Sequence, residues 1–198
     1  VLHHRVSGET DLCIGFPVAG RSHTELENQI GFFINTLVLR SRVESPQSFT
    51  VFLEQVRQNT IDAYAHQDYP FDEVVRDSRV VRDPSRNPLF DVMVVLQNTA
   101  NVLFDLPDLE ISSLDIDYGV TQFDLLWSFT ESDEGLNIEL RFNSDIYREA
   151  SVEKLLDYWQ ALVGSILAEP EAEIGRLTIL GPDQRSALLA SRPLPVSL

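Results

Sequence analysis

The sequence predicts an α/β fold in which a mixed sheet packs with two long amphipathic helices. Apolar runs at five or six places have the length and composition of strands, and two longer segments repeat apolar residues at helical spacing. The strands in the middle of the chain do not alternate with helices, so a regular doubly wound sheet is not expected. With 198 residues, 43% of them hydrophobic, the chain can build one sizeable core.

The first two predicted strands flank a segment rich in turn-forming residues. Residues 12–18 are apolar but contain Gly15 and Pro17, as in a buried strand that leaves the core. The segment that follows begins at Gly20 and ends in a short helical stretch. Residues 35–42, rich in Leu and Val, predict the second strand.

A long helix over residues 48–66 is the clearest predicted element, and Ser48 is its expected N-cap. Its apolar residues recur on one face: Phe49, Phe52, Leu53, Val56, Thr60, Ile61 and Tyr64. A shorter helix is expected from Pro70 through Val75. The charged residues 76–88 predict a loop.

The second half of the chain predicts more strands and the second long helix. Residues 89–97 are almost continuously apolar, which is typical of a central strand covered on both faces. Further strands are expected at 109–116, 123–130 and 136–143, with a hairpin turn at 133–135. The last helix is marked by Val152, Leu155, Leu156, Tyr158, Trp159, Leu162, Val163 and Ile166, with Ser151 as its expected N-cap.

The charge of the chain limits its partners. Asp and Glu number 31 against 15 Lys and Arg, a net charge of −16, which disfavours nucleic acid and anionic membranes as partners. The single Cys13 cannot form an intrachain disulfide, and no apolar stretch approaches the roughly 20 residues that span a bilayer. We expect a cytoplasmic protein, and the absence of an initiator Met suggests an excerpt of a longer one.

No common catalytic motif is present, so only individual residues are candidates for a site. Phosphate loops, paired metal ligands and nucleophile turns are absent. His3 and His4 invite a catalytic or metal-binding interpretation, but sequence neighbours point apart, and partly exposed structural histidines are expected instead. His66 is expected to stabilise the end of the long helix. The charged loop residues Arg82, Asp83 and Arg86 are expected to form ion pairs in solvent.

Two residues allow both a structural and a functional interpretation. Arg21 follows Gly20 on a turn after a strand, where it could form a scaffold ion pair or position a carboxylate or phosphate. Asn35 begins a strand and could simply bind backbone groups.

Four ordered stretches resemble the condensation domains of nonribosomal peptide synthetases. GFPVAGRSHTELENQIGFFINTLVLR (15–40) is similar to the family's Gly-Arg and IGFFVNTLVLR segments. AYAHQDYPFDEVV (63–75) resembles the HQDYPFE segment, and RDPSRNPLFDVMVVLQN (82–98) the RDxSRNPLFQVMF segment. FDLLWSF, GLNIELRFNSDIY and the last helix then follow in the family's order. The likeness covers about 2–180.

The resemblance implies a chloramphenicol acetyltransferase-like lobe whose catalytic residues lie outside this chain. The family's HHxxxDG motif belongs to the other, N-terminal lobe. His3-His4 has no Asp before its glycine and stands just before the Gly-Arg segment, so we do not identify it with that motif. As substrate-channel or positioning residues the resemblance implies Arg21, Asn35, Gln97 and Asn98. No metal is expected.

The resemblance also implies partners and domain limits. Residues 1–180 would be the C-terminal lobe of a condensation domain, and 181–198 a linker toward an adenylation-type domain. The partners would be the N-terminal lobe and two peptidyl carrier proteins, whose phosphopantetheine arms bring the substrates. The expected reaction joins two carrier-bound aminoacyl or peptidyl groups through an amide. The alternative is a degenerate, non-catalytic domain that recruits or scaffolds other proteins.

Overall fold

One five-stranded mixed sheet forms the centre of the computed structural model, which describes residues 1–81, 83–97, 119–133 and 135–190. The strand order is β2-β1-β3-β4-β5. Neighbouring β1, β3 and β4 run parallel, and β2 and β5 pair antiparallel at the two edges. The strands are β1 (Asp11–Val18), β2 (Asn35–Arg42), β3 (Val92–Gln97), β4 (Leu125–Ser132) and β5 (Gly135–Phe142). This confirms the predicted α/β class with a mixed sheet.

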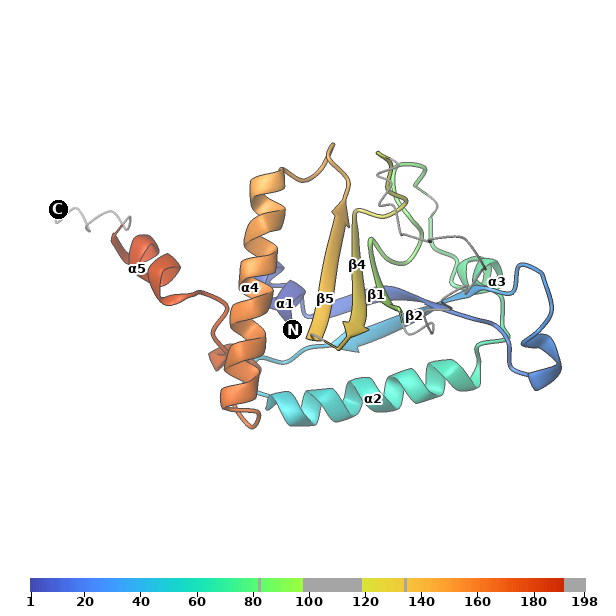
Figure 1. The fold of residues 1–198 in the computed structure, drawn as a ribbon, viewed down its shortest axis with the longest axis horizontal. Helices are drawn as coiled ribbons and strands as arrows, with labels where there is room; N and C mark the ends of the chain where they lie inside the picture. Colours follow the sequence, from blue (N-terminus) through green and yellow to red (C-terminus); the bar gives the residue numbers. More distant parts are fainter. Residues whose placement is uncertain (82, 98–118, 134, 191–198) are drawn as a thin grey trace, which may run out of the picture.

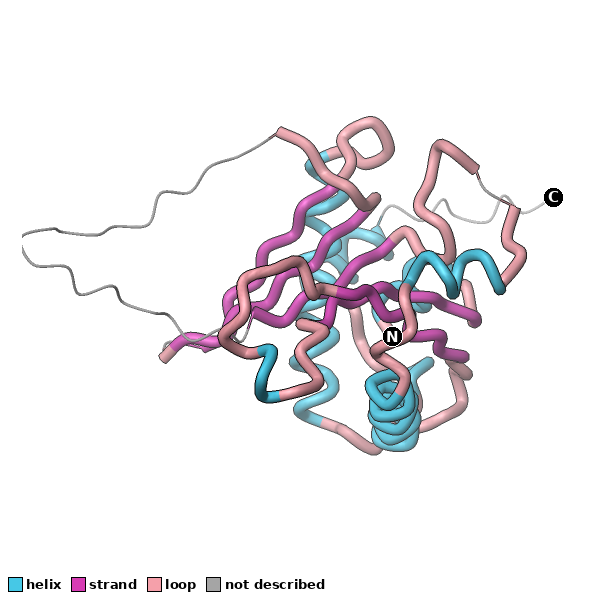
Figure 2. Tube along the Cα trace, turned by 90° about the vertical axis from the view of Figure 1, so that its right-hand side faces the viewer, coloured by secondary structure: helices cyan, strands magenta, loops and turns pink. Residues whose placement is uncertain are grey.

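The two long helices pack on the same face of the sheet, against different strands (Figure 1). Helix α4 stands beside β5, and α2 runs below β2; in Figure 2, α2 is seen nearly end-on beneath the strands. The helices are α1 (Leu2–Ser7), α2 (Phe49–Ala65), α3 (Phe71–Asp77), α4 (Glu149–Ala168) and α5 (Pro182–Ala190), with single 3-10 turns η1 (Thr24–Leu26) and η2 (Ile174–Arg176).

Helix starts test the capping predictions. Ser48 caps α2 as predicted, since its Oγ accepts a hydrogen bond from the Val51 amide at 3.4 Å. The predicted cap Ser151 is wrong, because the carbonyl of Arg148 already accepts the Ser151 amide at 2.8 Å and α4 begins at Glu149. Helix α1 was not predicted.

Strand limits also differ in places from the prediction. β3 begins at Val92 rather than at 89, because Leu89 has a left-handed backbone with φ of 72°. The hairpin of β4 and β5 is confirmed by the antiparallel pairing that ends at Ser132 and Gly135. The predicted strand at 109–116 lies outside the described residues. The end of the chain holds α5 within the predicted linker.

Two clusters of buried side chains fill the space between the sheet and its helices. In the larger cluster, Leu125 and Trp127 of β4 pack with Leu155 and Leu162 of α4, and Leu2 of α1 with Leu177. The smaller cluster joins Val43, Phe52 of α2 and Ile174. Arg5 connects the two ends of the chain, since its Nη1 donates to the carbonyls of Ile174 and Leu177, each at 2.7 Å.

The two adjacent histidines are built into this core. His4 is 6% exposed, so its predicted partial exposure is wrong: its ring nitrogens lie 2.8 Å from the carbonyl of Glu9 and 3.0 Å from Oγ of Ser45. His3 lies edge-to-face against Trp127, and burial lowers the pKa of its imidazole to about 4. Both positions pack against the sheet and its loops.

Candidate functional site

Three of the four predicted site residues lie at the carboxyl end of the parallel strands. Arg21 follows β1, Gln97 ends β3, and Asn35 opens β2 opposite Val18, the last residue of β1. Open α/β sheets commonly bind their ligands at this end. Asn98 lies outside the described residues.

The turn at Gly20 and Arg21 contacts Phe33, which lies near the end of the loop between β1 and β2. Gly20 has φ of 62°, and a Cβ there would lie 1.8 Å from the carbonyl oxygen of Phe33, so only glycine fits. The Arg21 guanidinium stacks 4.4 Å from the centre of the Phe33 ring and donates to the carbonyl of Leu26. Arg21 thus fixes the shape of the loop over residues 22–34.

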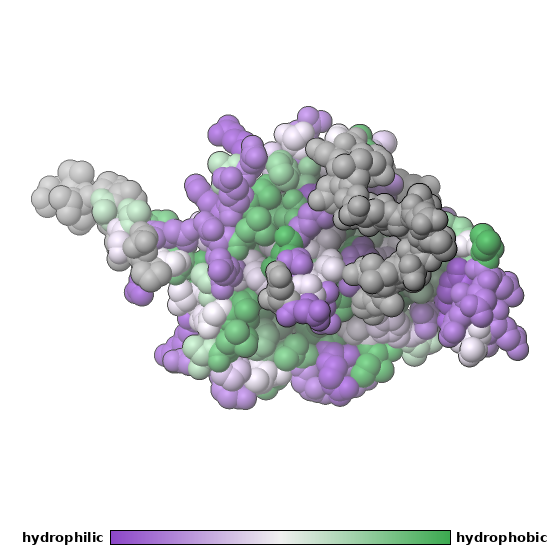
Figure 3. Space-filling model, viewed as in Figure 1, coloured by the Kyte–Doolittle hydropathy of each residue, from purple (hydrophilic) through white to green (hydrophobic). Residues whose placement is uncertain are grey.

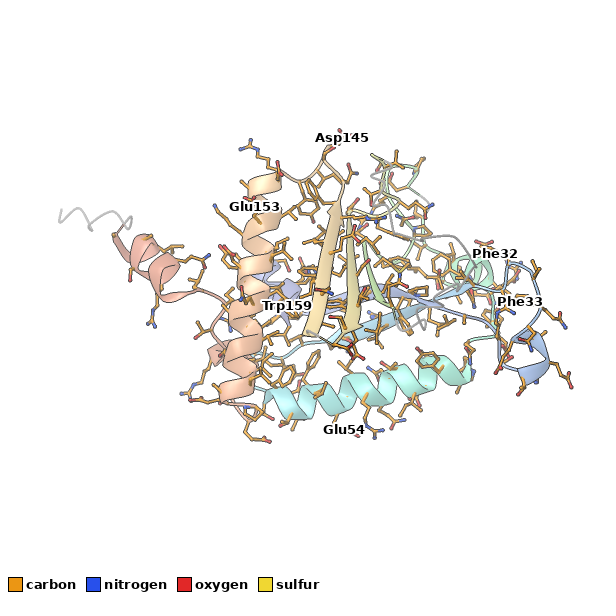
Figure 4. The ribbon with its side chains drawn as sticks, viewed as in Figure 1. Phe32, Phe33, Glu54, Asp145, Glu153 and Trp159 are labelled. Atoms are coloured by element: carbon orange, nitrogen blue, oxygen red, sulfur yellow. The ribbon has the colours of Figure 1, made fainter. Side chains whose placement is uncertain are left out.

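That loop presents apolar side chains to solvent. Ile30 is fully exposed, Phe32 is 90% exposed and Ile34 is 57% exposed. Figure 4 places Phe32 and Phe33 at the end of the molecule opposite α4, and in Figure 3 green, apolar surface stands beside purple residues at that end. Exposed apolar side chains gathered in this way are typical of a contact surface. We call Ile30, Phe32 and Ile34 the apolar loop surface.

Asn35 ties the first residue of β2 to the connection between α2 and α3. Its Nδ2 donates to the carbonyls of Gln67 and Tyr69 at 2.7 and 2.9 Å. Its Oδ1 accepts the amides of Thr36 and Phe71 at 2.9 and 3.1 Å. The side chain amide is therefore engaged with backbone on both sides, the scaffold arrangement that the sequence left open.

Gln97 is exposed and stands opposite Thr130 in the sheet register. Among the described residues, no hydrogen bond joins any two of Arg21, Asn35 and Gln97. The three residues lie at the same end of the sheet, but each contacts different neighbours.

A polar cluster lies at the opposite, amino end of β3 and β4. Arg86 pairs with Asp91, with Nε 3.0 Å from Oδ1, and its side chain is 58% exposed, which confirms the predicted ion pair in solvent; Arg82 lies outside the described residues. Asp83 accepts the amide and hydroxyl of Ser85 at 2.9 and 2.7 Å. Burial and the charge of Asp91 raise the pKa of the Asp124 carboxyl.

The side chains at the carboxyl end of the sheet can position a substrate but are not suited to proton transfer. Arginine and amide side chains orient polar groups, but at neutral pH they are poor proton acceptors. In the part of the chain that the structure describes, no three His, Cys, Asp or Glu side chains gather where they could hold a metal ion. Nor does any helix there have the length and apolar character to cross a membrane.

Comparison with known sequences identifies the family. The sequence model of the condensation domain matches residues 1–189. The chain belongs to the condensation domain family. Tyrocidine synthase 3 of Brevibacillus parabrevis is 36% identical over 185 residues, which are 93% of this chain and 3% of that protein. Gramicidin S synthase 2 of Brevibacillus brevis is 34% identical over 191 residues, 96% of this chain and 4% of the synthase.

Condensation-domain structures also share the fold. The four-domain nonribosomal peptide synthetase holo-AB3403, bound to AMP and glycine, matches with a TM-score of 0.84 and 26% identity over 93% of this chain and 15% of that protein. The X-domain from teicoplanin biosynthesis matches with a TM-score of 0.82 and 23% identity, over 90% of this chain and 42% of the X-domain chain. The chain thus spans less than half of either structure and a small fraction of its curated relatives.

The sequence predicted Arg21 and Asn35 as site residues, but it did not predict the residues that contact them. Phe33 stacks on Arg21 and the connection at 67–71 binds Asn35, although both contacts join segments that the motifs had already marked. The presence of these motifs together in one family indicated that their segments belong to one site. Only the structure shows which residues of these segments contact each other.

Proposed function

We propose that this chain is the C-terminal lobe of a nonribosomal peptide synthetase condensation domain. The complete domain forms an amide between two aminoacyl or peptidyl groups held as thioesters on carrier proteins. The catalytic HHxxxDG motif lies outside this chain, in the N-terminal lobe. The observation that carries the proposal is the match of one family model to residues 1–189.

Within this proposal the chain supplies one wall of the substrate channel. Arg21, Asn35 and Gln97 stand at the carboxyl end of the sheet, where the apolar loop surface would face the other lobe. Phosphopantetheine arms of an upstream and a downstream carrier protein carry the substrates, and an adenylation domain follows residues 181–198. Holding two reactants in place and excluding water lowers the barrier by up to several kcal/mol in general. Proton transfer belongs to the N-terminal lobe.

The test compares this chain with the intact domain. Two carrier proteins loaded with aminoacyl thioesters are mixed with either protein, and the amide product is followed by mass spectrometry. The intact domain should form the amide, and replacement of the motif histidine in its N-terminal lobe should abolish it. Amide formation by the 198-residue chain alone, clearly above background, would refute the assignment of the base to the other lobe.

Arg21 provides a sharper test within this chain. In the intact domain, Arg21→Ala should lower kcat/KM by about tenfold or more, because the loop over 22–34 loses its anchor on Phe33. Arg21→Lys keeps the charge but loses the planar stacking, so it should recover only part of the rate. Arg148→Ala, at the start of α4, is the control. Equal rates for all three variants would contradict a positioning role.

The alternative is a condensation-like domain that recruits or scaffolds other proteins without chemistry. The fold alone does not distinguish the two, because the teicoplanin X-domain, for which a structure in complex with OxyB is also known, shares it. A well-folded intact domain that binds carrier proteins yet forms no amide would favour this alternative.

A further inference from the structure

Strand β2 forms one edge of the sheet, and an open groove lies between this strand and helix α2. The groove has a volume of about 410 Å³, and its walls are Arg40 and Arg42 on the strand and Gln55 and Asn59 on the helix. Arg42 ends β2, seven residues from Asn35, which corresponds to roughly 23 Å along an extended strand. The groove is therefore separate from the carboxyl-end site.

The hydrogen bonds between β1 and β2 show which backbone groups of β2 point toward its open side. Val43, one residue beyond β2, donates its amide to the carbonyl of Thr10 at 2.8 Å, and the two residues continue the register of the strands. In an antiparallel ladder, such hydrogen-bonded pairs alternate with pairs that do not bond, so bonded pairs recur at Ser41, Leu39 and Leu37. The residues between them point their N–H and C=O away from β1. We call these backbone groups of Val38, Arg40 and Arg42 the outward groups.

The outward groups have no partner among the described residues. The next residue of the same alternation, Thr36, donates its amide to Oδ1 of Asn35 at 2.9 Å, so a side chain closes the edge there. No hydrogen bond of this kind, from backbone or side chain of another described residue, reaches Val38, Arg40 or Arg42 on their outer side. A strand edge with unpaired N–H and C=O groups is a template for a further strand.

The opposite wall of the groove offers the same two kinds of hydrogen-bonding group. Gln55 and Asn59 lie one turn apart on α2, a spacing of about 6 Å, and each side chain amide carries both a donor and an acceptor. Alternate residues of an extended chain repeat at a similar distance, of roughly 7 Å. A strand added to β2 would therefore bond to the outward groups along one edge and present its other edge to these two amides.

The charges beside the outward groups favour an occupant without basic side chains. Asp11 binds Arg40 through two hydrogen bonds, of 2.8 and 2.6 Å, and lies 3.8 Å from Arg42, whose side chain is 78% exposed. Two guanidinium groups thus share one carboxylate. A second copy of this chain that paired here through its own β2 would add further arginines, and like charges opposite each other destabilise a sheet.

We propose that the open edge of β2 binds an extended, non-basic segment of another polypeptide, which adds a sixth strand to the sheet. The segment bonds through its backbone to the outward groups, and its other edge lies against Gln55 and Asn59. Backbone pairing tolerates many side chains, so the partner is defined by its extended conformation and its charge. The proposal goes beyond the proposed function and does not depend on it.

Hydrogen exchange on the full-length protein tests this edge directly. In the protein alone, protection should alternate along β2: amides that bond to β1 exchange slowly, and the outward amides of Val38, Arg40 and Arg42 exchange fast. The probe is a capped peptide of about six residues that alternates Thr and Val and contains a single Glu. Its addition should slow the outward amides about tenfold or more and leave the inward amides unchanged.

Modified peptides and two variants show whether backbone pairing is the cause of binding. The peptide N-methylated at every second residue keeps one edge that can bond, so it should still bind. The same peptide N-methylated at every residue should bind at least about tenfold more weakly. Arg40→Pro removes one outward amide and leaves the bonds to β1 in place, so it should weaken binding of the unmodified peptide about tenfold. Arg40→Ala keeps that amide and should remain within about twofold of wild type.

Several results would overturn the proposal. They are slow exchange of the outward amides in the protein alone, no added protection at millimolar peptide, equal binding of the two methylated peptides, or equal binding by Arg40→Pro and Arg40→Ala. Protection that appears without peptide and rises with protein concentration would assign the edge to a second copy instead. The methylated peptides are compared on the wild-type protein, so that comparison remains decisive if Arg40→Pro does not fold.

Discussion

Gly15 illustrates how one residue in β1 depends on a distant part of the chain. A Cβ at this position would lie 2.3 Å from the ring of Phe90, closer than any real contact. Phe90 also stacks on Phe123 and touches Phe71, so the ring has little room to move. The glycine therefore allows three aromatic side chains to pack beneath the sheet.

Replacement of Gly15 should consequently cost stability. Gly15→Ala is expected to lower the free energy of unfolding by about 1–3 kcal/mol, through displacement of Phe90. The measurement is urea unfolding followed by fluorescence. Gly164→Ala is the matched control: nothing lies within 4 Å of a Cβ there, and in the interior of α4 alanine should stabilise by about 0.5–1 kcal/mol. Equal stabilities of the two variants would contradict the close approach.

At the scale of elements, Asn35 joins β2 to the connection between α2 and α3. Asn35→Ala removes all four of its hydrogen bonds and should lower stability by about 1–3 kcal/mol. Asn35→Asp keeps the oxygen that accepts the two amides, but it loses both donors and places a carboxylate oxygen near the carbonyls of Gln67 and Tyr69. Hydrogen exchange distinguishes them: the amides of Thr36 and Phe71 should lose protection in Asn35→Ala and keep it in Asn35→Asp. Protection of both amides in Asn35→Ala would show that the junction does not depend on this side chain.

The sequence predicted elements better than the contacts between them. Helix α2 and its cap at Ser48 follow from local periodicity and capping chemistry, and both are confirmed. Helix α1 was missed because its six residues show too little periodicity, and its stability comes from packing of Leu2 and from the bonds of Arg5 to residues far along the chain. The site followed the same rule: family motifs pointed to Arg21 and Asn35, while their partners required the tertiary structure.

At the scale of the whole molecule, the apolar loop surface should make the isolated chain associate with itself. The free energy falls when a second surface covers exposed apolar side chains such as Phe32. Light scattering on the 198-residue chain should show a mass that rises with concentration, and Phe32→Ser should reduce this rise. Leu167→Ser is the control, because it removes an exposed apolar side chain on α4, away from the apolar loop surface. A concentration-independent monomer, without the other lobe, would count against the prediction.

The stability of the whole fold should also fall in mild acid. Folding lowers the pKa of His3 from 6.5 to about 4, mainly by burial. Between these pH values the unfolded chain binds a proton that the folded chain does not, so the free energy of unfolding decreases as the pH falls from 6.5 to 4. His3→Phe should remove about 1–2 kcal/mol of this decrease and keep the edge-to-face contact with Trp127. His23→Gln, at an exposed histidine, is the control, and an unchanged pH profile in His3→Phe would contradict the assignment.

The bonds from Arg5 to the carbonyls of Ile174 and Leu177 set a condition on synthesis at the ribosome. Leu2 and Leu177 belong to one cluster, so the larger core cannot close until residue 177 has left the exit tunnel. Until then Leu2 of α1 lacks part of its final surroundings, whereas β1 and β2 can already pack against α2. This nascent chain therefore depends on its own late residues, and a translational pause before residue 177 would prolong the period in which chaperones and proteases can act on it.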